Sequence, residues 1–208
     1  MPVWYAAYGS NLSRDRFLTY LKGGRPPGAS RSYRGARDTR PPTAERAFTM
    51  PGQVFFGWES PTWGGGIAFY DADTSGAVLA RVYRVTEQQF ADVAAQEMHR
   101  EPGEHLDLGH VLQHARQELG PGRYETLHLV GELDGEPVLT FTATKRLAVQ
   151  RNPPSPAYLR TVAHGLRETH GVGVDDVVAY LLRCPGVGPH WSAQAVRELL
   201  TTSAPRPG

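Results

Sequence analysis

The order of apolar and polar residues predicts a strand, a tight turn and a helix at the start of the chain. Val3 to Tyr8 is a continuous apolar and aromatic run, which is typical of a buried strand. Gly9-Ser10-Asn11 ends this run and favours a turn. Ser13 to Lys22 then shows helical spacing, with Ser13 placed to cap the helix. The next segment, Gly23 to Trp63, contains six prolines and has no clear period, so we expect it to be irregular.

Four further strands are predicted. Ile67 to Tyr70 and Val78 to Val85 are short apolar runs separated by turn-forming residues. Tyr124 to Leu133 and Pro137 to Thr144 alternate between apolar and polar residues. Asp134-Gly135 lies between these two runs and is the strongest hairpin signal in the chain.

Five later stretches have helical spacing. Thr86 and Gln89 form a capping-box pattern at the start of the first of them. Ser155 as N-cap and Pro156 at the first helical position mark the start of another. The expected helices run from about Thr86 to Met98, Gly109 to Leu119, Ser155 to His170, Asp175 to Leu182 and Ser192 to Leu200.

Composition favours a globular protein of mixed class. The 208 residues include 23 glycines and 17 prolines, and so many chain breakers argue against a coiled coil or an all-helical bundle. Strands and helices do not alternate regularly enough for a doubly wound sheet, and the two-residue hairpin requires antiparallel pairing. We therefore expect an α+β fold, with a small curved mixed or antiparallel β-barrel and surrounding helices.

Charge, cysteine content and hydropathy exclude several classes of protein. The formal net charge of +1 provides no global field for binding nucleic acid. The single cysteine, Cys184, excludes an intramolecular disulfide and a cysteine-only zinc site, and its apolar surroundings favour a buried, inert thiol. No apolar run reaches membrane-spanning length, and the N-terminus does not resemble a signal peptide. We therefore expect a soluble, cytoplasmic protein that does not bind membranes.

The turn after the first strand is one candidate for chemistry. A strand, a Gly-Ser-Asn turn and a helix start place unpaired backbone N–H groups at one concave spot, beside the positive end of the helix. Such an arrangement suits a carboxylate or a phosphate, and Gly9 permits close approach to the backbone. An ordinary strand-to-helix turn is the competing interpretation, and the residues alone leave both open.

Glu97 is a second candidate. It lies late in the helix that follows Thr86, beside the apolar stripe that includes Val93 and Ala94. A carboxylate on that side of a helix is costly unless it is paired or functional. The alternative is a solvated charge at a helix end.

Three stretches, in this order, resemble the gamma-glutamylcyclotransferase-like family. Tyr8 to Leu12 reads Tyr-Gly-Ser-Asn-Leu, which is similar to the family's N-terminal signature. Val82 to Glu97 looks like the strand and helix that carry the family's acidic residue, and Asn152 to Leu159 is similar to its Pro-Ser-x-x-Tyr helix start. The resemblance implies a cyclotransferase-like domain over residues 1–171 and a C-terminal helical extension over residues 172–208 that packs on it.

The resemblance also implies an activity. The enzyme would be a cofactor-independent acyltransferase that cyclises a γ-glutamyl amine to 5-oxoproline and releases the amine or amino acid. The α-amino group of such a substrate is its own nucleophile, so the reaction needs no metal and no cofactor. Glu97 would be the general acid and base, with a pKa raised by burial. The expected substrate-binding residues are Tyr8, Gly9, Ser10, Asn11, Leu12 and Tyr158.

Two alternatives remain open in this interpretation. Tyr158 either reaches the pocket or packs in the core as a helix-face tyrosine. A non-catalytic module that binds a small carboxylate or amide in the same pocket is the alternative to an enzyme. The leaving group and the oligomeric state do not follow from the sequence.

Two other groups of residues are weaker candidates. His110 and His114 have the i, i+4 spacing of a shared metal site, with His99 and His105 nearby, but the HExxH frame and an evident third ligand are missing. Basic residues at every third position suggest a patch for an acidic partner or for nucleic acid, or else a solvated loop paired with carboxylates. These residues are Arg31, Arg34, Arg37 and Arg40. We expect neither a metal nor a nucleic acid as a partner.

Overall fold

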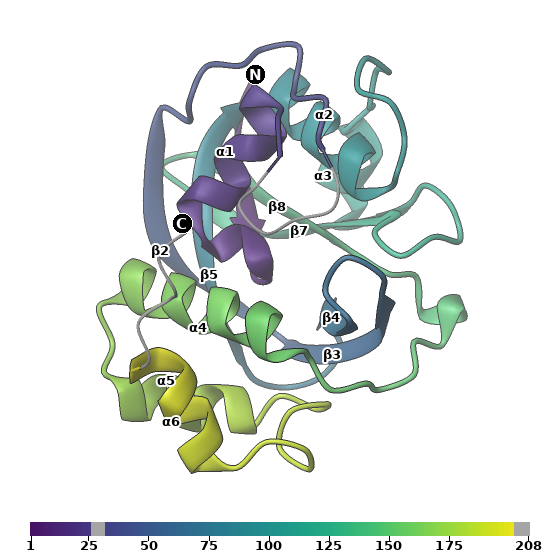
Figure 1. The fold of residues 1–208 in the computed structure, drawn as a ribbon. Helices are drawn as coiled ribbons and strands as arrows, with labels where there is room; N and C mark the ends of the chain where they lie inside the picture. The colour runs from purple at the N-terminus through teal and green to yellow at the C-terminus, as the bar shows by residue number, and fades with distance from the viewer. Residues whose placement is uncertain (26–31, 202–208) are drawn as a thin grey trace.

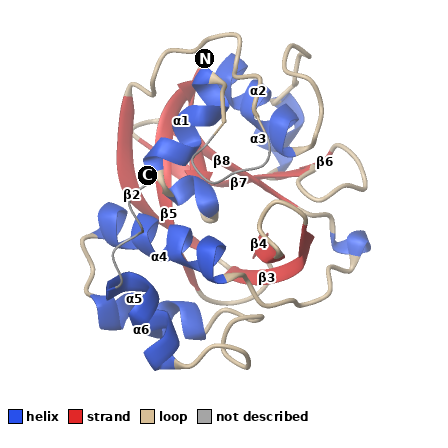
Figure 2. Cartoon of the chain, in the orientation of Figure 1, coloured by secondary structure: helices blue, strands red, loops and turns tan. Residues whose placement is uncertain are grey.

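The computed structural model describes residues 1–25 and 32–201, and in them a curved sheet is packed between helices (Figure 1). Six strands form a mixed sheet in the order β2-β5-β1-β8-β7-β6, and β3 and β4 form a separate antiparallel ribbon (Figure 2). The strands are β1 (Pro2–Ala7), β2 (Ala44–Pro51), β3 (Gln53–Ser60), β4 (Gly65–Asp71), β5 (Ala77–Thr86), β6 (Arg116–Glu118), β7 (Thr126–Leu133) and β8 (Glu136–Thr142). The helices are α1 (Arg14–Lys22), α2 (Glu87–Glu97), α3 (Gly109–His114), α4 (Pro156–His170), α5 (Val174–Leu182) and α6 (Ala193–Thr201), with short 3-10 turns η1 (Ser10–Leu12) and η2 (Lys145–Leu147).

Strand β1 lies at the centre of the sheet and is buried on both faces. It pairs antiparallel with β5 and parallel with β8. Val3, Tyr5 and Ala7 belong to a core that includes apolar residues of α1, α2 and α3. The alternate residues Trp4 and Ala6 belong to a second core, which the ribbon and α4, α5 and α6 complete. Side chains of a strand alternate between its two faces, so a continuous apolar run is what this position requires.

The α+β class and the curved mixed sheet are confirmed, whereas a closed barrel is not formed. The ribbon β3-β4 is a separate sheet, so the six-stranded sheet stays open. The local signals at two helix starts and at the hairpin are also confirmed. Thr86 and Gln89 form a complete capping box, and the Ser155 side chain accepts a hydrogen bond at the start of α4. Asp134 and Gly135 have φ values of 54° and 76°, as a two-residue type I′ turn requires.

Two predictions for the middle of the chain are wrong. The segment expected to be irregular contains all of β2 and β3. Strand β2 is an edge strand with mostly exposed residues, so it lacks an apolar pattern, and Gly52, with φ of 109°, makes the turn that follows it. The helix expected over 109–119 ends at His114, where Ala115 has φ of 61°, and the chain continues as β6 against β7.

Asp92 and Gln96 form a stripe of buried polar side chains on α2, and this polar stripe holds the segment from Gly35 to Arg40 in place. Asp92 is fully buried and accepts hydrogen bonds from the backbone and the guanidinium of Arg37. Gln96 accepts from the Gly35 N–H and donates to the Tyr20 carbonyl. A buried polar group is costly unless it is hydrogen-bonded, and these groups are satisfied by the backbone of Gly35 and Arg37, the guanidinium of Arg37 and the Tyr20 carbonyl of α1.

The C-terminal helices share the second core. Val177, Leu181 and Val196 are fully buried in the same cluster as Trp4. The thiol of Cys184 is also buried, which raises its pKa to about 12, as expected for an inert cysteine. The last residues of the expected extension, 202–208, lie outside the described residues. No helix in the described ranges is long and apolar enough to span a lipid bilayer.

Close backbone contacts position α4 against the turn after β1. Gly66 lies so near the segment before α4 that a Cβ there would be 2.0 Å from the Asn152 carbonyl oxygen. Gly165 makes a similar contact, since a Cβ on it would lie 2.6 Å from the Cβ of the fully buried Leu12. Helix α4 therefore approaches η1 closely only because position 165 has no side chain.

Gly165→Ala tests this contact. In a helix interior, alanine is ordinarily more stable than glycine by about 1 kcal/mol. Overpacking a tight contact costs about 1–3 kcal/mol, so we expect a net loss in the free energy of unfolding, measured by urea denaturation. His164→Ala, at an exposed neighbouring position of the same helix, is the control and should change stability by no more than about 0.5 kcal/mol. A more stable Gly165→Ala variant would contradict the close packing.

Candidate functional site

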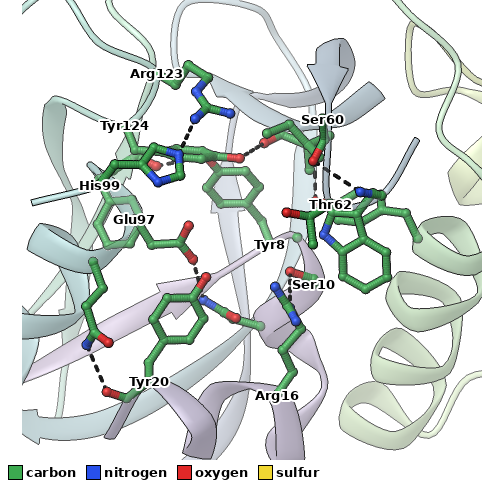
Figure 3. A pocket seen from close by; sticks show the side chains of 18 of the residues that line it. Tyr8, Ser10, Arg16, Tyr20, Ser60, Thr62, Glu97, His99, Arg123 and Tyr124 are labelled. Atoms are coloured by element: carbon green, nitrogen blue, oxygen red, sulfur yellow. Dashed lines mark hydrogen bonds between the residues drawn. The ribbon is translucent and has the colours of Figure 1, made fainter. Parts of the chain in front are cut away.

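A cavity of about 210 Å³ opens between the end of β1, the end of α2 and the turn that joins β3 to β4 (Figure 3). The walls are rich in tyrosine and carry both a carboxylate, Glu97, and the guanidinium groups of Arg16 and Arg123. The lining tyrosines are Tyr5, Tyr8, Tyr20, Tyr33, Tyr124 and Tyr158. Such a cavity combines an apolar body with a few convergent polar groups, which is the usual composition of a small-molecule site.

Glu97 is the last residue of α2 and faces the cavity. The capping box at Thr86 sets where α2 begins, and its 11 residues then bring its end over the end of β1. Asn11, from the turn after β1, donates from Nδ2 to Glu97 Oε1 over 3.0 Å. The same Nδ2 lies 3.2 Å from the hydroxyl of Tyr5. The two candidate segments of the sequence therefore meet directly in the structure.

The surroundings of Glu97 favour its protonated form more than water does. Burial raises the pKa of Glu97 above its ordinary value, and hydrogen bonds from Tyr20 and Asn11 offset part of that rise. The positive charges of Arg16 and Arg123 also lower the pKa of Glu97. A carboxyl group whose pKa is raised in this way is suited to take up and release a proton.

Three cavity tyrosines have their hydroxyls held by the backbone. Tyr8 donates to the Phe141 carbonyl over 2.8 Å, and Tyr124 donates to the Ala68 carbonyl over 3.0 Å. Tyr158 accepts a hydrogen bond from the Ala68 N–H over 3.0 Å, and burial raises the pKa of Tyr158 to about 12. Tyr158 therefore reaches the cavity as a neutral hydroxyl, and it is also buried in the core, so both expectations for it hold.

The turn after β1 lies at the cavity. Gly9, Ser10 and Asn11 line the cavity, and the N–H groups of Ser10 and Asn11 precede the first hydrogen bond of η1. Leu12 does not line the cavity. Its side chain is fully buried and its N–H donates to the Gly9 carbonyl over 3.0 Å, so the 3-10 turn already uses that donor. A Cβ on Gly9 would lie 3.0 Å from the Tyr158 hydroxyl, so a glycine fits here.

Sequence reasoning missed the charged and aromatic residues that complete the cavity. Arg16 lies on α1 and is 8% exposed, and its guanidinium lies 4.8 Å from the ring centre of Trp63. Arg123 lies in the loop before β7, in contact with His99 and 5.3 Å from the ring centre of Trp58. No local signal distinguishes these arginines, because only the packing of α1 and of the loop turns them toward the cavity.

The competing candidates do not converge on a site. His110 and His114 are exposed neighbours on α3, whereas His99 lines the cavity, and the described ranges contain no group of three or more His, Cys, Asp or Glu that could hold a metal ion.

The arginine segment is largely paired. Arg37 forms an ion pair with Asp92, Arg40 with Asp38, and Arg34 with Glu101. Arg31 lies outside the described residues. Among the described members, the interpretation as a carboxylate-paired segment fits better than a free basic patch.

Comparisons with known proteins bear on the fold. No family model matches the chain. Over 204 residues, the chain is 32% identical to a protein named histone deacetylase 5 from Arabidopsis thaliana; the match covers 87% of this chain and 30% of that protein. The chain thus spans less than a third of this curated relative, and the name describes the longer protein.

Two solved structures share the architecture. One is titled gamma-glutamyl cyclotransferase, with a TM-score of 0.50, 18% sequence identity and 86% of each chain covered. The other is an uncharacterized protein from Homo sapiens, with a TM-score of 0.50, 19% identity and 86% of each chain covered. At such identities a likeness establishes the fold alone. The resemblance found in the sequence is therefore confirmed at that level: the chain has the fold of gamma-glutamyl cyclotransferase.

Proposed function

We propose that the protein is a cyclotransferase that converts a γ-glutamyl amine to 5-oxoproline and releases the amine. The observation that carries this proposal is the contact between Asn11 and Glu97, which puts a partly buried carboxylate beside the Gly-Ser-Asn turn in a cavity lined by aromatic residues. A lactam-forming reaction requires a proton carrier and a folded substrate, and the cavity provides groups for both tasks.

The substrate supplies the nucleophile. Its α-ammonium loses a proton to the Glu97 carboxylate, and the resulting amine attacks the γ-carbonyl carbon to form a five-membered ring. The bond from that carbon to the amide nitrogen then breaks, and protonated Glu97 gives its proton to the leaving nitrogen. The ring nitrogen loses its second proton by the same route, so that the products are a neutral lactam and a protonated amine. Holding the chain folded for this attack is a proximity effect, worth about 7–11 kcal/mol in well-oriented cases.

The turn after β1 is suited to the charge that develops during the attack. The γ-carbonyl oxygen becomes negative in the tetrahedral intermediate, and donors fixed before the reaction stabilise it without reorganisation. The backbone N–H of Asn11 is a candidate for this role, since η1 does not use it, whereas the Ser10 N–H is directed at the Tyr158 hydroxyl. The Asn11 carbonyl accepts from the Tyr83 hydroxyl over 2.8 Å, which holds the turn in place.

A screen for 5-oxoproline release tests the proposal. Purified protein is incubated with γ-glutamyl amino acids, γ-glutamyl amines and ε-(γ-glutamyl)-lysine, and products are identified by mass spectrometry. Stoichiometric 5-oxoproline from at least one member of the panel is expected. Saturable binding of 5-oxoproline without turnover of any member would instead favour a non-catalytic module.

Glu97→Gln should abolish most of the activity. The amide keeps the shape of the side chain but cannot accept the ammonium proton, and a general acid–base group typically contributes about 10²–10⁴-fold. We expect a loss of kcat in that range with KM little changed. Glu101→Gln is the matched control, because Glu101 is exposed and paired with Arg34 outside the cavity. Wild-type turnover in Glu97→Gln, together with loss of turnover in Glu101→Gln or Glu104→Gln, would indicate that the general base lies in the loop after α2.

The pH dependence of the wild type should report the same group. Because burial raises the pKa of Glu97, the acid limb of the kcat profile should fall at a pH above the ordinary glutamate value of about 4.3. An acid limb at or below that value would contradict Glu97 as the base.

The stability of Glu97→Gln should depend on pH with a definite sign. A carboxyl group with a raised folded-state pKa binds more protons in the folded state than in the unfolded state. Its ionisation therefore lowers the free energy of unfolding as the pH rises above the unfolded-state pKa of about 4.3. We therefore expect Glu97→Gln to be more stable than the wild type at pH 7, with the difference shrinking toward pH 4. Thermal denaturation at both pH values measures this, and a destabilised variant at pH 7 would contradict it.

A further inference from the structure

Two arginines are buried in the described structure, and they differ in what neutralises them. Arg81 is 6% exposed and Arg16 is 8% exposed. The guanidinium of Arg81 lies 3.0 Å from Glu168 Oε1 and 3.6 Å from Glu45 Oε2, and it also donates to the Leu12 carbonyl. Arg81 therefore has the paired environment expected of a structural buried charge.

Arg16 has only neutral partners. Its Nε donates to the Ser10 hydroxyl over 3.0 Å, and one Nη donates to the Tyr33 hydroxyl over 2.8 Å. The ring of Trp63 covers one face of the guanidinium. Within the described ranges no carboxylate lies within ion-pair distance of Arg16, and the remaining residues, 26–31 and 202–208, contain no Asp or Glu.

A buried guanidinium without an anion is an expensive arrangement. Burial acts to lower the pKa of Arg16, but Tyr20, Tyr33 and the charge of Glu97 outweigh it, so Arg16 stays charged. Glu97 and Arg16 project from different helices into the same cavity without touching each other (Figure 3). Beside Arg123, the cavity thus presents a carboxylate and a buried guanidinium to its occupant, which match the two charges of an α-amino acid.

We infer that Arg16, stacked on Trp63, is the receptor for the α-carboxylate of the γ-glutamyl group, while Glu97 faces the α-ammonium. This inference rests on the proposed function and deepens it, because it makes a free α-carboxylate a requirement of the substrate. The planar guanidinium can bind a carboxylate through two parallel hydrogen bonds. The Asn11 N–H is then left for the γ-carbonyl oxygen, and the Ser10 hydroxyl, which accepts from Arg16 Nε, lies beside it in the same turn.

Arg123 is the rival receptor. It lies nearer the opening of the cavity, where it contacts His99 and covers the ring of Trp58, which is 39% exposed. With Glu97 and Arg16 assigned to the glutamyl end, Arg123 is left to face the part of the substrate that leaves. The two arginines can be separated by experiment, since only the receptor should discriminate between a ligand with a carboxylate and the same ligand with a carboxamide.

The test measures binding and turnover with matched ligand pairs. Calorimetry compares 5-oxoproline with 5-oxoprolinamide, which differs only in carrying a carboxamide in place of the carboxylate. Turnover compares a γ-glutamyl amine with its α-carboxamide analogue. The variants are Arg16→Gln, Arg16→Lys and Arg123→Gln. Arg14→Gln is the control, because Arg14 lies on the same helix, pairs with Glu45 over 2.6 Å and does not line the cavity.

The wild type should bind the acid about 10- to 100-fold more tightly than the amide, as a charge-assisted hydrogen-bonded pair predicts. Arg16→Gln should bring this affinity ratio close to one by weakening only the binding of the acid. Arg16→Lys should retain part of the preference for the acid. Arg14→Gln and Arg123→Gln should keep the wild-type ratio. In turnover, Arg16→Gln should raise KM for the acid substrate and leave the amide substrate unchanged.

Several results would overturn the inference. Equal binding of acid and amide by the wild type would do so, and so would a collapse of the ratio in Arg123→Gln rather than in Arg16→Gln. An equal loss of affinity for the acid and the amide in a folded Arg16→Lys variant would indicate that Arg16 has only a structural role. The binding arm needs no turnover, so a protein that discriminates through Arg16 but releases no 5-oxoproline refutes the proposed function and leaves the carboxylate receptor supported.

Discussion

The hydrogen bond from Asn11 to Glu97 joins the two parts of the chain on which the site depends. It requires the end of β1 and the end of α2 to meet, and both positions follow from packing. Strand β1 is held at the centre of the sheet because both of its faces are buried, and the capping box at Thr86 sets the start of α2 directly after β5. The polar stripe on α2 then holds Gly35 and Arg37, shortly after Tyr33, which lines the cavity.

The cavity keeps two opposite charges apart in a place where proteins usually pair or exclude them. Burial raises the pKa of Glu97, and Arg16 is held by neutral groups rather than by a carboxylate. Either arrangement costs stability relative to an apolar cavity or a closed ion pair. An occupant with an ammonium and a carboxylate would relieve both costs at once, which is why the charge pattern favours an amino-acid-like ligand over a neutral one.

The predictable parts of this fold and site are those with strong local signals. The apolar run of β1, the capping box, the Asp-Gly hairpin and the Ser-Pro start of α4 each carry their structure in a few adjacent residues. Strand β2 carries no such signal, because an edge strand exposes most of its side chains and needs no apolar pattern. Glu97 was found through its place beside an apolar stripe and through the family resemblance.

Arg16 shows why the rest of the site was not predictable. Arg14 and Arg16 stand two residues apart in the same helix, with nothing in the sequence to separate them. One pairs with Glu45 near the surface, and the other is buried against Trp63, which comes from the turn between β3 and β4. The difference arises only when the packing of α1 brings Arg16 against that turn. Leu12 shows the converse, because a residue inside the recognised motif has its N–H consumed by the 3-10 turn.

The central claim is that the substrate's own amino group, rather than water, attacks the γ-carbonyl in this cavity. The most direct measurement is turnover of a γ-glutamyl amine in water enriched in ¹⁸O, with the products identified by mass spectrometry. The proposed mechanism predicts 5-oxoproline that carries no ¹⁸O, together with one equivalent of released amine. Glutamate labelled with ¹⁸O in its γ-carboxyl group would show hydrolysis by water and would contradict it.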